Sequence, residues 1–261
     1  MELITSRQNT LIKKIAELKQ KKTRQEQQLF LVEGTRSLEE ALASDWVLQE
    51  LFCLEDASQA CRNLMALLPD SQCHLVTTEV MAKLADTTTP QGVLGVMQMR
   101  QASLAPLLTK QGLILALDGV RDPGNVGTII RTADAAGLAG VILLEECADI
   151  YSPKVVRSTM GSLFHLPVVT TTREELIASA RAAGWELWVS TLEGGTDVYA
   201  TDCADKIVLV LGNEAFGASA AMQEAATRKV YLPMAGQAES LNVAVAGGVF
   251  AFDITRRQRL Q

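Results

Sequence analysis

The stretch GLILALDGVRDPGNVGTIIRTADAAG, residues 112–137, decides the fold class of this chain. It begins with the continuous apolar run GLILAL, which is typical of a strand covered on both faces. A glycine-bearing turn follows, and then an apolar helix over 125–136, for which Asn125 is the expected N-cap. A strand, a turn and a helix in this order predict an α/β domain in which ligands bind beyond the carboxyl ends of parallel strands.

The same alternation continues through the second half of the chain, where VILLE and IVLVLG are again continuous rather than alternating apolar runs. It predicts a mostly parallel sheet with helices on both faces. We expect strands at 112–118, 140–145, 166–170, 185–191, 206–211 and 229–233, and helices at 125–136, 153–161, 172–183, 219–227 and 240–258.

The first half predicts a smaller α/β sandwich with mainly parallel pairing. We expect strands at 29–34, 47–54, 73–78 and 92–99, and helices at 9–21, 35–44, 57–68 and 78–86. The segment RQASLAPLLTKQ, residues 100–111, interrupts the alternation with a proline and small polar residues. The expected domains are therefore a basic N-terminal helix or arm at 1–28, a first domain at 29–100, a linker at 101–111 and a second domain at 112–261.

Composition excludes several classes of protein. No apolar run is long enough to span a membrane and the N-terminus lacks the apolar core of a signal peptide, so we expect a cytoplasmic protein with no membrane partner. The five cysteines are scattered without a CxxC pair, and there are only two histidines. These counts favour reduced, buried thiols and no metal site.

Charge is distributed unevenly along the chain. The net charge is −6, yet residues 1–28 carry seven basic side chains, Arg24 among them, against three acidic ones. Such asymmetry indicates a basic helix that meets a polyanion, with a simply solvated helix face as the alternative.

The loop DPGNVG fails both standard phosphate-binding templates. Asp122 stands where a dinucleotide fingerprint needs its first glycine, and Asn125-Val126 follow where a P-loop needs Lys-Ser/Thr. A nucleotide-dependent oxidoreductase is therefore disfavoured.

Three loops at strand ends carry the candidate chemistry. Arg131 lies one helical turn after Gly127, and its other interpretation is a surface arginine paired with Asp122 or Asp134. Glu214, in LGNEAFGAS, can be a ligand acceptor or a helix-entry charge.

The third loop leads into the last helix, for which Ser240 is the expected N-cap. Within that helix Gly247 and Gly248 each cost about 1 kcal/mol relative to alanine, so something must approach the backbone closely. A neighbouring helix, a flat cofactor and a tightly threaded chain are the alternatives.

Together the motifs N125-x5-R131-T-A, L211-G-N-E-A-F-G217 and L232-P-M-A-G…S240-L-N-V-A-V-A246 resemble the SpoU (TrmH-type) family of RNA ribose 2′-O-methyltransferases, within the SPOUT methyltransferases. In the first half, FLVEGTRSLEEAL is similar to the family's substrate-binding domain, itself similar to α/β/α ribosomal RNA-binding proteins.

The resemblance implies an S-adenosylmethionine cofactor, a deep C-terminal trefoil knot, and a homodimer whose active site draws on both chains. It also implies two groups of site residues and no metal. The expected cofactor contacts are Thr191, Gly212, Leu232, Met234 and Leu241, and the expected catalytic residues are Asn125, Arg131, Glu214, Ser240 and Asn242.

The resemblance assigns Arg131 as the base, but a guanidinium stays protonated in proteins. We therefore expect Arg131 to bind the phosphate of the target nucleotide and stabilise the forming alkoxide, and Glu214 to orient Asn125 or the ribose. The first helix and residues 29–99 are expected to bind folded RNA.

The expected function is methylation of a ribose 2′-hydroxyl in RNA, with ribosomal RNA as the first expectation. The alternatives are a tRNA ribose 2′-O-methyltransferase, and a non-catalytic RNA-binding or ribosome-assembly factor on the same fold.

Overall fold

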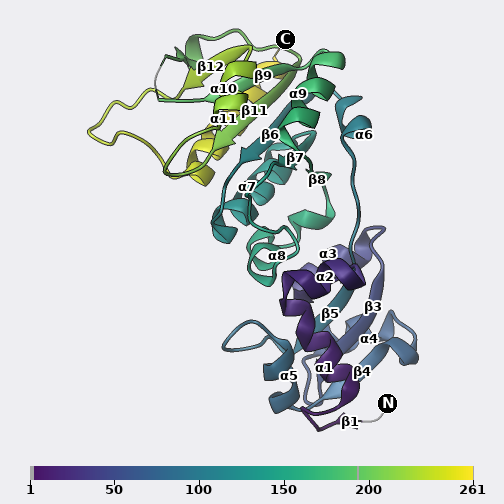
Figure 1. Ribbon diagram of the computed structural model, residues 1–261. Coiled ribbons are helices and arrows are strands. Elements are labelled where there is room, and N and C mark those ends of the chain that lie inside the picture. The colour runs from purple at the N-terminus through teal and green to yellow at the C-terminus, as the bar shows by residue number, and fades with distance from the viewer. Residues whose placement is uncertain (1–2, 193, 261) are drawn as a thin grey trace. The chain divides into compact units, whose positions relative to one another are not determined.

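The chain forms two compact units in a computed structural model that describes residues 3–192 and 194–260. Unit 1 comprises Met1–Arg100 and Asp149–His165, and unit 2 comprises Gln101–Ala148 and Leu166–Gln261 (Figure 1). The segment Asp149–His165 belongs to unit 1, whereas the sequence predicts that the whole of 112–261 forms the second domain.

Unit 1 is built on a five-stranded sheet in the order β1-β4-β3-β5-β2. β1 and β3 pair with β4 in parallel, whereas β5 pairs antiparallel with both β3 and β2, so the sheet is mixed rather than mainly parallel. The strands are β1 (Leu3–Ile4), β2 (Leu29–Glu33), β3 (Leu48–Leu54), β4 (Cys73–Val76) and β5 (Val93–Gln98).

Helices cover the unit 1 sheet, and the basic N-terminal helix belongs to its core. Ile12, Ile15 and Leu18 are buried against Phe52 and neighbouring strand residues. Residues 3–28 are thus part of a folded unit. The helices are α1 (Thr10–Ala16), η1 (Glu17–Lys19), α2 (Lys21–Gln27), α3 (Thr35–Ala43), α4 (Gln59–Ala66), η2 (Asp70–Gln72) and α5 (Thr78–Leu84).

The segment Asp149–His165, with α8 (Pro153–Thr159) and η3 (Ser162–Phe164), is held in unit 1 by charge and aromatic contacts. Arg24, only 2% exposed, donates from Nη2 to Asp149 Oδ2 at 2.6 Å. The ring of Tyr151 lies 4.6 Å from that of Phe30. These partners are far away in the sequence, so a local pattern does not predict them.

Unit 2 contains a seven-stranded sheet in which every pair is parallel, in the order β10-β12-β9-β11-β6-β7-β8. The parallel arrangement places all carboxyl ends at one edge of the sheet. The strands are β6 (Gly112–Asp118), β7 (Gly140–Leu143), β8 (Val168–Thr170), β9 (Glu186–Ser190), β10 (Thr196–Asp197), β11 (Lys206–Gly212) and β12 (Arg228–Tyr231).

Helices lie on both faces of this sheet, as predicted (Figure 1). One face packs against α6 (Leu104–Leu108), α9 (Arg173–Ala182) and α10 (Ala220–Ala225), and the other against α7 (Pro123–Ala136) and α11 (Val243–Gln258). A short η4 (Val198–Ala200) follows β10. The expected linker 101–111 contains α6, whose leucines are buried in this core.

The small residues of α11 are explained by its neighbours. A Cβ on Gly247 would lie 2.8 Å from Leu211 Cδ1 of β11, and one on Gly248 would lie 3.4 Å from Thr132 Cγ2 of α7. The close approach is therefore to a strand and a neighbouring helix.

The helices α7 and α11 are capped by other residues than the sequence predicts. Asp122 caps α7, with Oδ1 accepting from the Asn125 N–H at 2.9 Å, so Asn125 lies inside the first turn. Asn242 caps α11 in place of Ser240, its Oδ1 accepting from the N–H of Ala244 at 2.9 Å. Among the described residues, no helix is long and apolar enough to cross a membrane.

Candidate functional site

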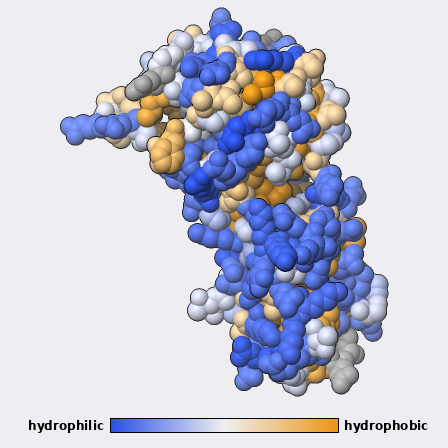
Figure 2. Space-filling view, viewed as in Figure 1, coloured by the Kyte–Doolittle hydropathy of each residue, from blue (hydrophilic) through white to orange (hydrophobic). Residues whose placement is uncertain are grey.

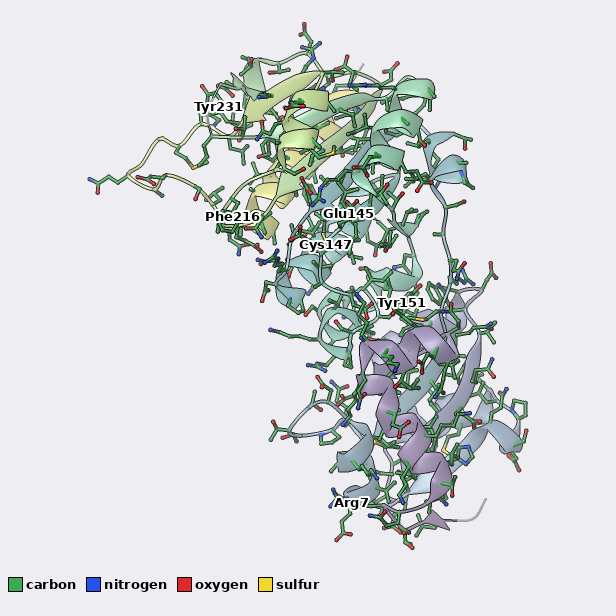
Figure 3. The ribbon with its side chains drawn as sticks, viewed as in Figure 1. Arg7, Glu145, Cys147, Tyr151, Phe216 and Tyr231 are labelled. Atoms are coloured by element: carbon green, nitrogen blue, oxygen red, sulfur yellow. The ribbon has the colours of Figure 1, made fainter. Side chains whose placement is uncertain are left out.

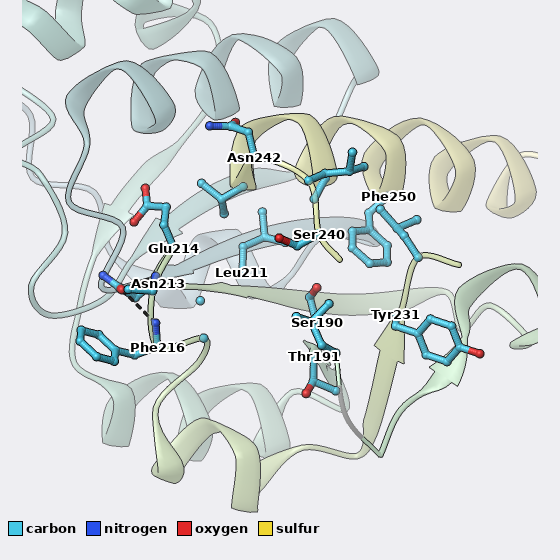
Figure 4. A pocket seen from close by; sticks show the side chains of 18 of the residues that line it. Ser190, Thr191, Leu211, Asn213, Glu214, Phe216, Tyr231, Ser240, Asn242 and Phe250 are labelled. Atoms are coloured by element: carbon cyan, nitrogen blue, oxygen red, sulfur yellow. Dashed lines mark hydrogen bonds between the residues drawn. The ribbon is translucent and has the colours of Figure 1, made fainter. Parts of the chain in front are cut away.

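A cavity of about 640 Å³ lies at the carboxyl edge of the unit 2 sheet (Figure 4). Its walls come from the ends of β9, β11 and β12 and from the loop that precedes α11. This volume falls within the range of small-molecule pockets in proteins. The five residues expected to contact a cofactor all line it: Thr191, Gly212, Leu232, Met234 and Leu241.

The lining combines apolar and polar groups. Leu211, Leu232 and Phe250 supply buried apolar surface, while Ser190 and Ser240 add hydroxyl groups. Figure 4 shows Tyr231 at one end of the cavity and Glu214 at the other. Such a cavity suits a ligand with a flat apolar part and several polar groups.

Three of the expected catalytic side chains form a continuous hydrogen-bonded chain. Nδ2 of Asn242 donates to Oδ1 of Asn125 at 3.0 Å, and Nδ2 of Asn125 donates to Oε1 of Glu214 at 2.8 Å. These residues come from the start of α11, the first turn of α7 and the loop after β11. The chain of amides fixes the carboxylate at the cavity, since Glu214 and Asn242 also line it.

The loop that carries Glu214 folds back tightly on β11. Asn213 and Gly217 exchange two backbone hydrogen bonds, of 3.0 and 2.9 Å. A Cβ on Gly212 would lie 2.0 Å from the backbone nitrogen of Ala218, so only glycine fits at that position. The side chain of Asn213 ties this loop to the preceding one, with Nδ2 donating to Gly119 O at 2.8 Å.

Asp118 is a further positioning residue, which the sequence interpretation missed. It is 2% exposed, and its carboxylate accepts from Arg173 Nε and from the Ser219 N–H, both at 2.7 Å. Asp118 therefore links β6 and α9 to the end of the Glu214 loop. The available signal was a charged residue closing an otherwise apolar strand.

Arg131 is not brought to this cavity in its own chain. It lies on the exposed face of α7, does not line the cavity, and within residues 3–192 and 194–260 its side chain makes no hydrogen bond or ion pair. The expected alternative, a surface pairing with Asp122 or Asp134, is not formed.

Where the structure describes the chain, the cysteines and the metal-ligating types of side chain show no further site. No disulfide joins the five cysteines, and burial raises the pKa of Cys53 to about 12 and that of Cys147 to about 11. In the part of the chain that the structure describes, no group of three or more His, Cys, Asp or Glu side chains could hold a metal ion.

Comparison with known families matches both parts of the chain. Residues 112–252 match the SpoU rRNA Methylase family. The chain belongs to this family. Residues 9–95 match the MRM3-like substrate binding domain.

Several relatives match this member of the SpoU family over most of its length. It is 35% identical to the 23S rRNA (guanosine(2553)-2'-O)-methyltransferase RlmP of Bacillus subtilis, over 97% of this chain and 99% of the relative. It is 33% identical to the 23S rRNA (uridine(2479)-2'-O)-methyltransferase of Streptomyces viridochromogenes, over 88% and 83% of the two chains.

Solved structures agree with the fold. The AdoMet-bound rRNA methyltransferase from Sinorhizobium meliloti aligns with a TM-score of 0.88 at 34% identity, covering 98% of this chain and 97% of that one. The predicted SPOUT-type α/β class is confirmed, while the trefoil knot stays a prediction.

Proposed function

We propose that this protein transfers a methyl group from S-adenosylmethionine to the 2′-hydroxyl of a ribose in ribosomal RNA. The observation that carries the proposal is the chain Asn242–Asn125–Glu214, which ends at the cavity lined by all five expected cofactor-contacting residues. The names of the relatives support a substrate in 23S rRNA.

The cavity fits the cofactor by the chemistry of its lining. Leu211, Leu232 and Phe250 offer apolar surface for a purine, and Thr191 and the Gly212 backbone offer polar groups for its edges. When bound, the cofactor supplies a methyl group on a sulfonium sulfur. The protein's own task is then to place an oxygen nucleophile in line with that carbon.

Glu214 orients the ribose in this account. Its Oε1 is engaged by Asn125, and within the described residues its Oε2 makes no hydrogen bond, so Oε2 can accept from the ribose 2′-hydroxyl. An oxygen held in this way directs a lone pair toward the methyl carbon. As the oxygen–carbon bond forms, the hydroxyl exchanges its hydrogen bond to Oε2 for one to water or to a phosphate of the RNA, which takes the proton.

Arg131 serves as a positive charge that binds and stabilises anionic groups, and not as a base. Its guanidinium stays protonated and matches a phosphate through two parallel hydrogen bonds. We propose that it holds the phosphate of the target nucleotide and stabilises the charge that develops on the attacking oxygen.

A homodimer explains why Arg131 is exposed and apart from its own cavity. α11 presents Val245 and Phe252, 53% and 56% exposed and seven residues apart, on one helical face. An exposed apolar stripe of this kind suits a self-complementary interface. In such a dimer Arg131 would serve the partner's cavity.

Unit 1 supplies affinity for the RNA. Lys13, Lys14 and Lys21 are exposed on its first helices, whereas Arg24 is buried and Lys19 is drawn inward to the backbone oxygen of Lys83 at 2.8 Å. Removal of residues 1–28 would also remove core residues, so charge reversal at Lys13 and Lys14 is the better probe of RNA binding. We also propose a cytoplasmic enzyme, in keeping with a ribosomal RNA substrate.

Binding of S-adenosylmethionine tests the cavity directly by calorimetry. We expect one site per chain, and a loss of affinity of at least about tenfold in Ala246→Leu, because the added side chain fills space at the lining. Ala182→Phe, on the exposed end of α9, is the matched control. Unchanged affinity in Ala246→Leu would contradict the proposed site.

A further inference from the structure

Phe216 is the most exposed large hydrophobic side chain among the described residues, at 87% (Figure 3). Four other phenylalanines, at positions 30, 52, 164 and 250, are each 6% exposed or less. A single exposed apolar side chain is common on protein surfaces, so exposure alone implies nothing. A role for Phe216 therefore depends on the loop that carries it and on the residues beside that loop.

The backbone of this loop is held rigidly. Oδ1 of Asn213 accepts from the N–H of Ala215 at 2.9 Å and from the N–H of Phe216 at 3.3 Å, inside the turn closed by the Asn213–Gly217 pair. Nδ2 of Asn213 anchors the turn to Gly119 O. A ring on such a backbone has only two side-chain torsions to lose on binding, so little entropy opposes a contact.

The ring also stands beside the proposed reacting group. Phe216 follows Glu214 by two residues, and both line the cavity. Figure 4 shows the ring at the Glu214 end, away from Tyr231 and Ser190. The base of a nucleotide is attached to the carbon adjacent to the one that bears the 2′-hydroxyl. A ribose held at Glu214 therefore brings its base to the neighbourhood of Phe216.

The chemistry of the ring selects RNA over a second copy of the chain. Flat aromatic faces are the usual platforms for unstacked bases, and they accept any base because every base has a π-face. The apolar surface proposed for self-association is that of Val245 and Phe252 on α11, and the side chain that a second copy is proposed to bring to this cavity is the charged Arg131.

We propose that Phe216 stacks on the base of the nucleotide whose ribose is methylated. This inference rests on the proposed function and adds to it a substrate-contacting residue that is not among the expected catalytic and cofactor-binding residues. The contact forms before the reaction and persists through it, so it contributes equally to ground-state and transition-state binding.

Steady-state methyl transfer tests the contact with the full-length protein and ribosomal RNA isolated from a strain that lacks it. Phe216→Ala should raise KM for the RNA by about 5- to 150-fold and leave kcat within about threefold. Phe216→Leu should raise KM for the RNA by as much as Phe216→Ala does, because leucine keeps apolar bulk without a π-face. Phe216→Trp should restore KM to within about threefold of the native value.

The controls separate stacking from structure. Tyr199→Ala removes a 53% exposed aromatic ring that does not line the cavity, and should behave as the native protein. The affinity for S-adenosylmethionine and the mass in solution should be unchanged in Phe216→Ala.

Three results would overturn the proposal: native KM in Phe216→Ala, native KM in Phe216→Leu, or a changed oligomeric mass, which would assign the ring to a second copy. If the native protein methylates no RNA, the proposed function fails and the stacking role falls with it. If the native protein is active and Phe216→Ala is unaltered, only the stacking role fails.

Discussion

The carboxylate of Glu214 is anchored through one oxygen, since Oε1 accepts from Asn125 at 2.8 Å. Glu214→Gln keeps one acceptor oxygen, which serves either the Asn125 amide or the ribose hydroxyl, so a purely orienting role loses one hydrogen bond and predicts a fall in kcat of no more than about tenfold. Glu214→Gln is to be compared with Glu224→Gln, an exposed position on α10, under saturating cofactor and RNA. Complete loss of turnover in Glu214→Gln alone would assign proton transfer to the carboxylate.

The buried thiol of Cys53 and the half-buried thiol of Cys147 give a pH prediction. Burial raises the pKa of Cys53 to about 12 and that of Cys147 to about 11, above the ordinary thiol value near 8.5. Both should react with iodoacetamide at pH 8 far more slowly in the folded protein than in urea, as measured by peptide mass. Their contribution to stability is fully present below about pH 8.5 and is lost as the pH rises toward 11 and 12. Rapid alkylation of both in the folded protein would contradict the burial.

The last helix offers a matched pair of glycines. Gly248→Ala meets Thr132 Cγ2 at an ordinary 3.4 Å, so the gain in helix propensity, about 1 kcal/mol, should stabilise the fold. Gly247→Ala meets Leu211 Cδ1 at 2.8 Å, so this buried side chain must shift, which offsets the gain in helix propensity. Chemical denaturation should therefore rank Gly248→Ala above Gly247→Ala by at least about 1 kcal/mol. Equal stabilities would mean that α11 is not packed as described.

The starts of α7 and α11 illustrate what local sequence predicts. Strands and helices of unit 2 follow from apolar runs, but each of the two helices has several residues able to cap it. Pro123 at the first helical position was the signal for Asp122 rather than Asn125. For α11, Ser240 and Asn242 are both good caps, and only packing of the preceding loop decides between them.

The mixed sheet of unit 1 and the placement of Asp149–His165 depend on contacts between distant residues. Buried strands have the same apolar pattern whether their pairing is parallel or antiparallel, so β5 could not be oriented from sequence. Arg24, counted as a surface charge, is instead the buried partner of Asp149. The sequence does indicate the five residues that share one cavity, because they follow strand ends that a parallel sheet brings together, while their contact with a cofactor stays a prediction.

A composite active site makes a prediction for mixed dimers. Arg131→Ala and Glu214→Ala should each be nearly inactive alone. If Arg131 serves the partner's cavity, a re-equilibrated equal mixture regains about a quarter of native activity, because half the dimers are mixed and each has one intact site. Recovery is measured as labelled methyl transfer after mixing. A mixture no more active than its components would place both residues in the site of one chain.

The most direct measurement is transfer of labelled methyl groups from S-adenosylmethionine to ribosomal RNA from a strain lacking this protein, followed by alkaline hydrolysis. A 2′-O-methyl group removes the hydroxyl that attacks the adjacent phosphate, so the account predicts label in an alkali-resistant dinucleotide, lost in Glu214→Ala. Label on a base, or no transfer to ribosomal RNA, would contradict it.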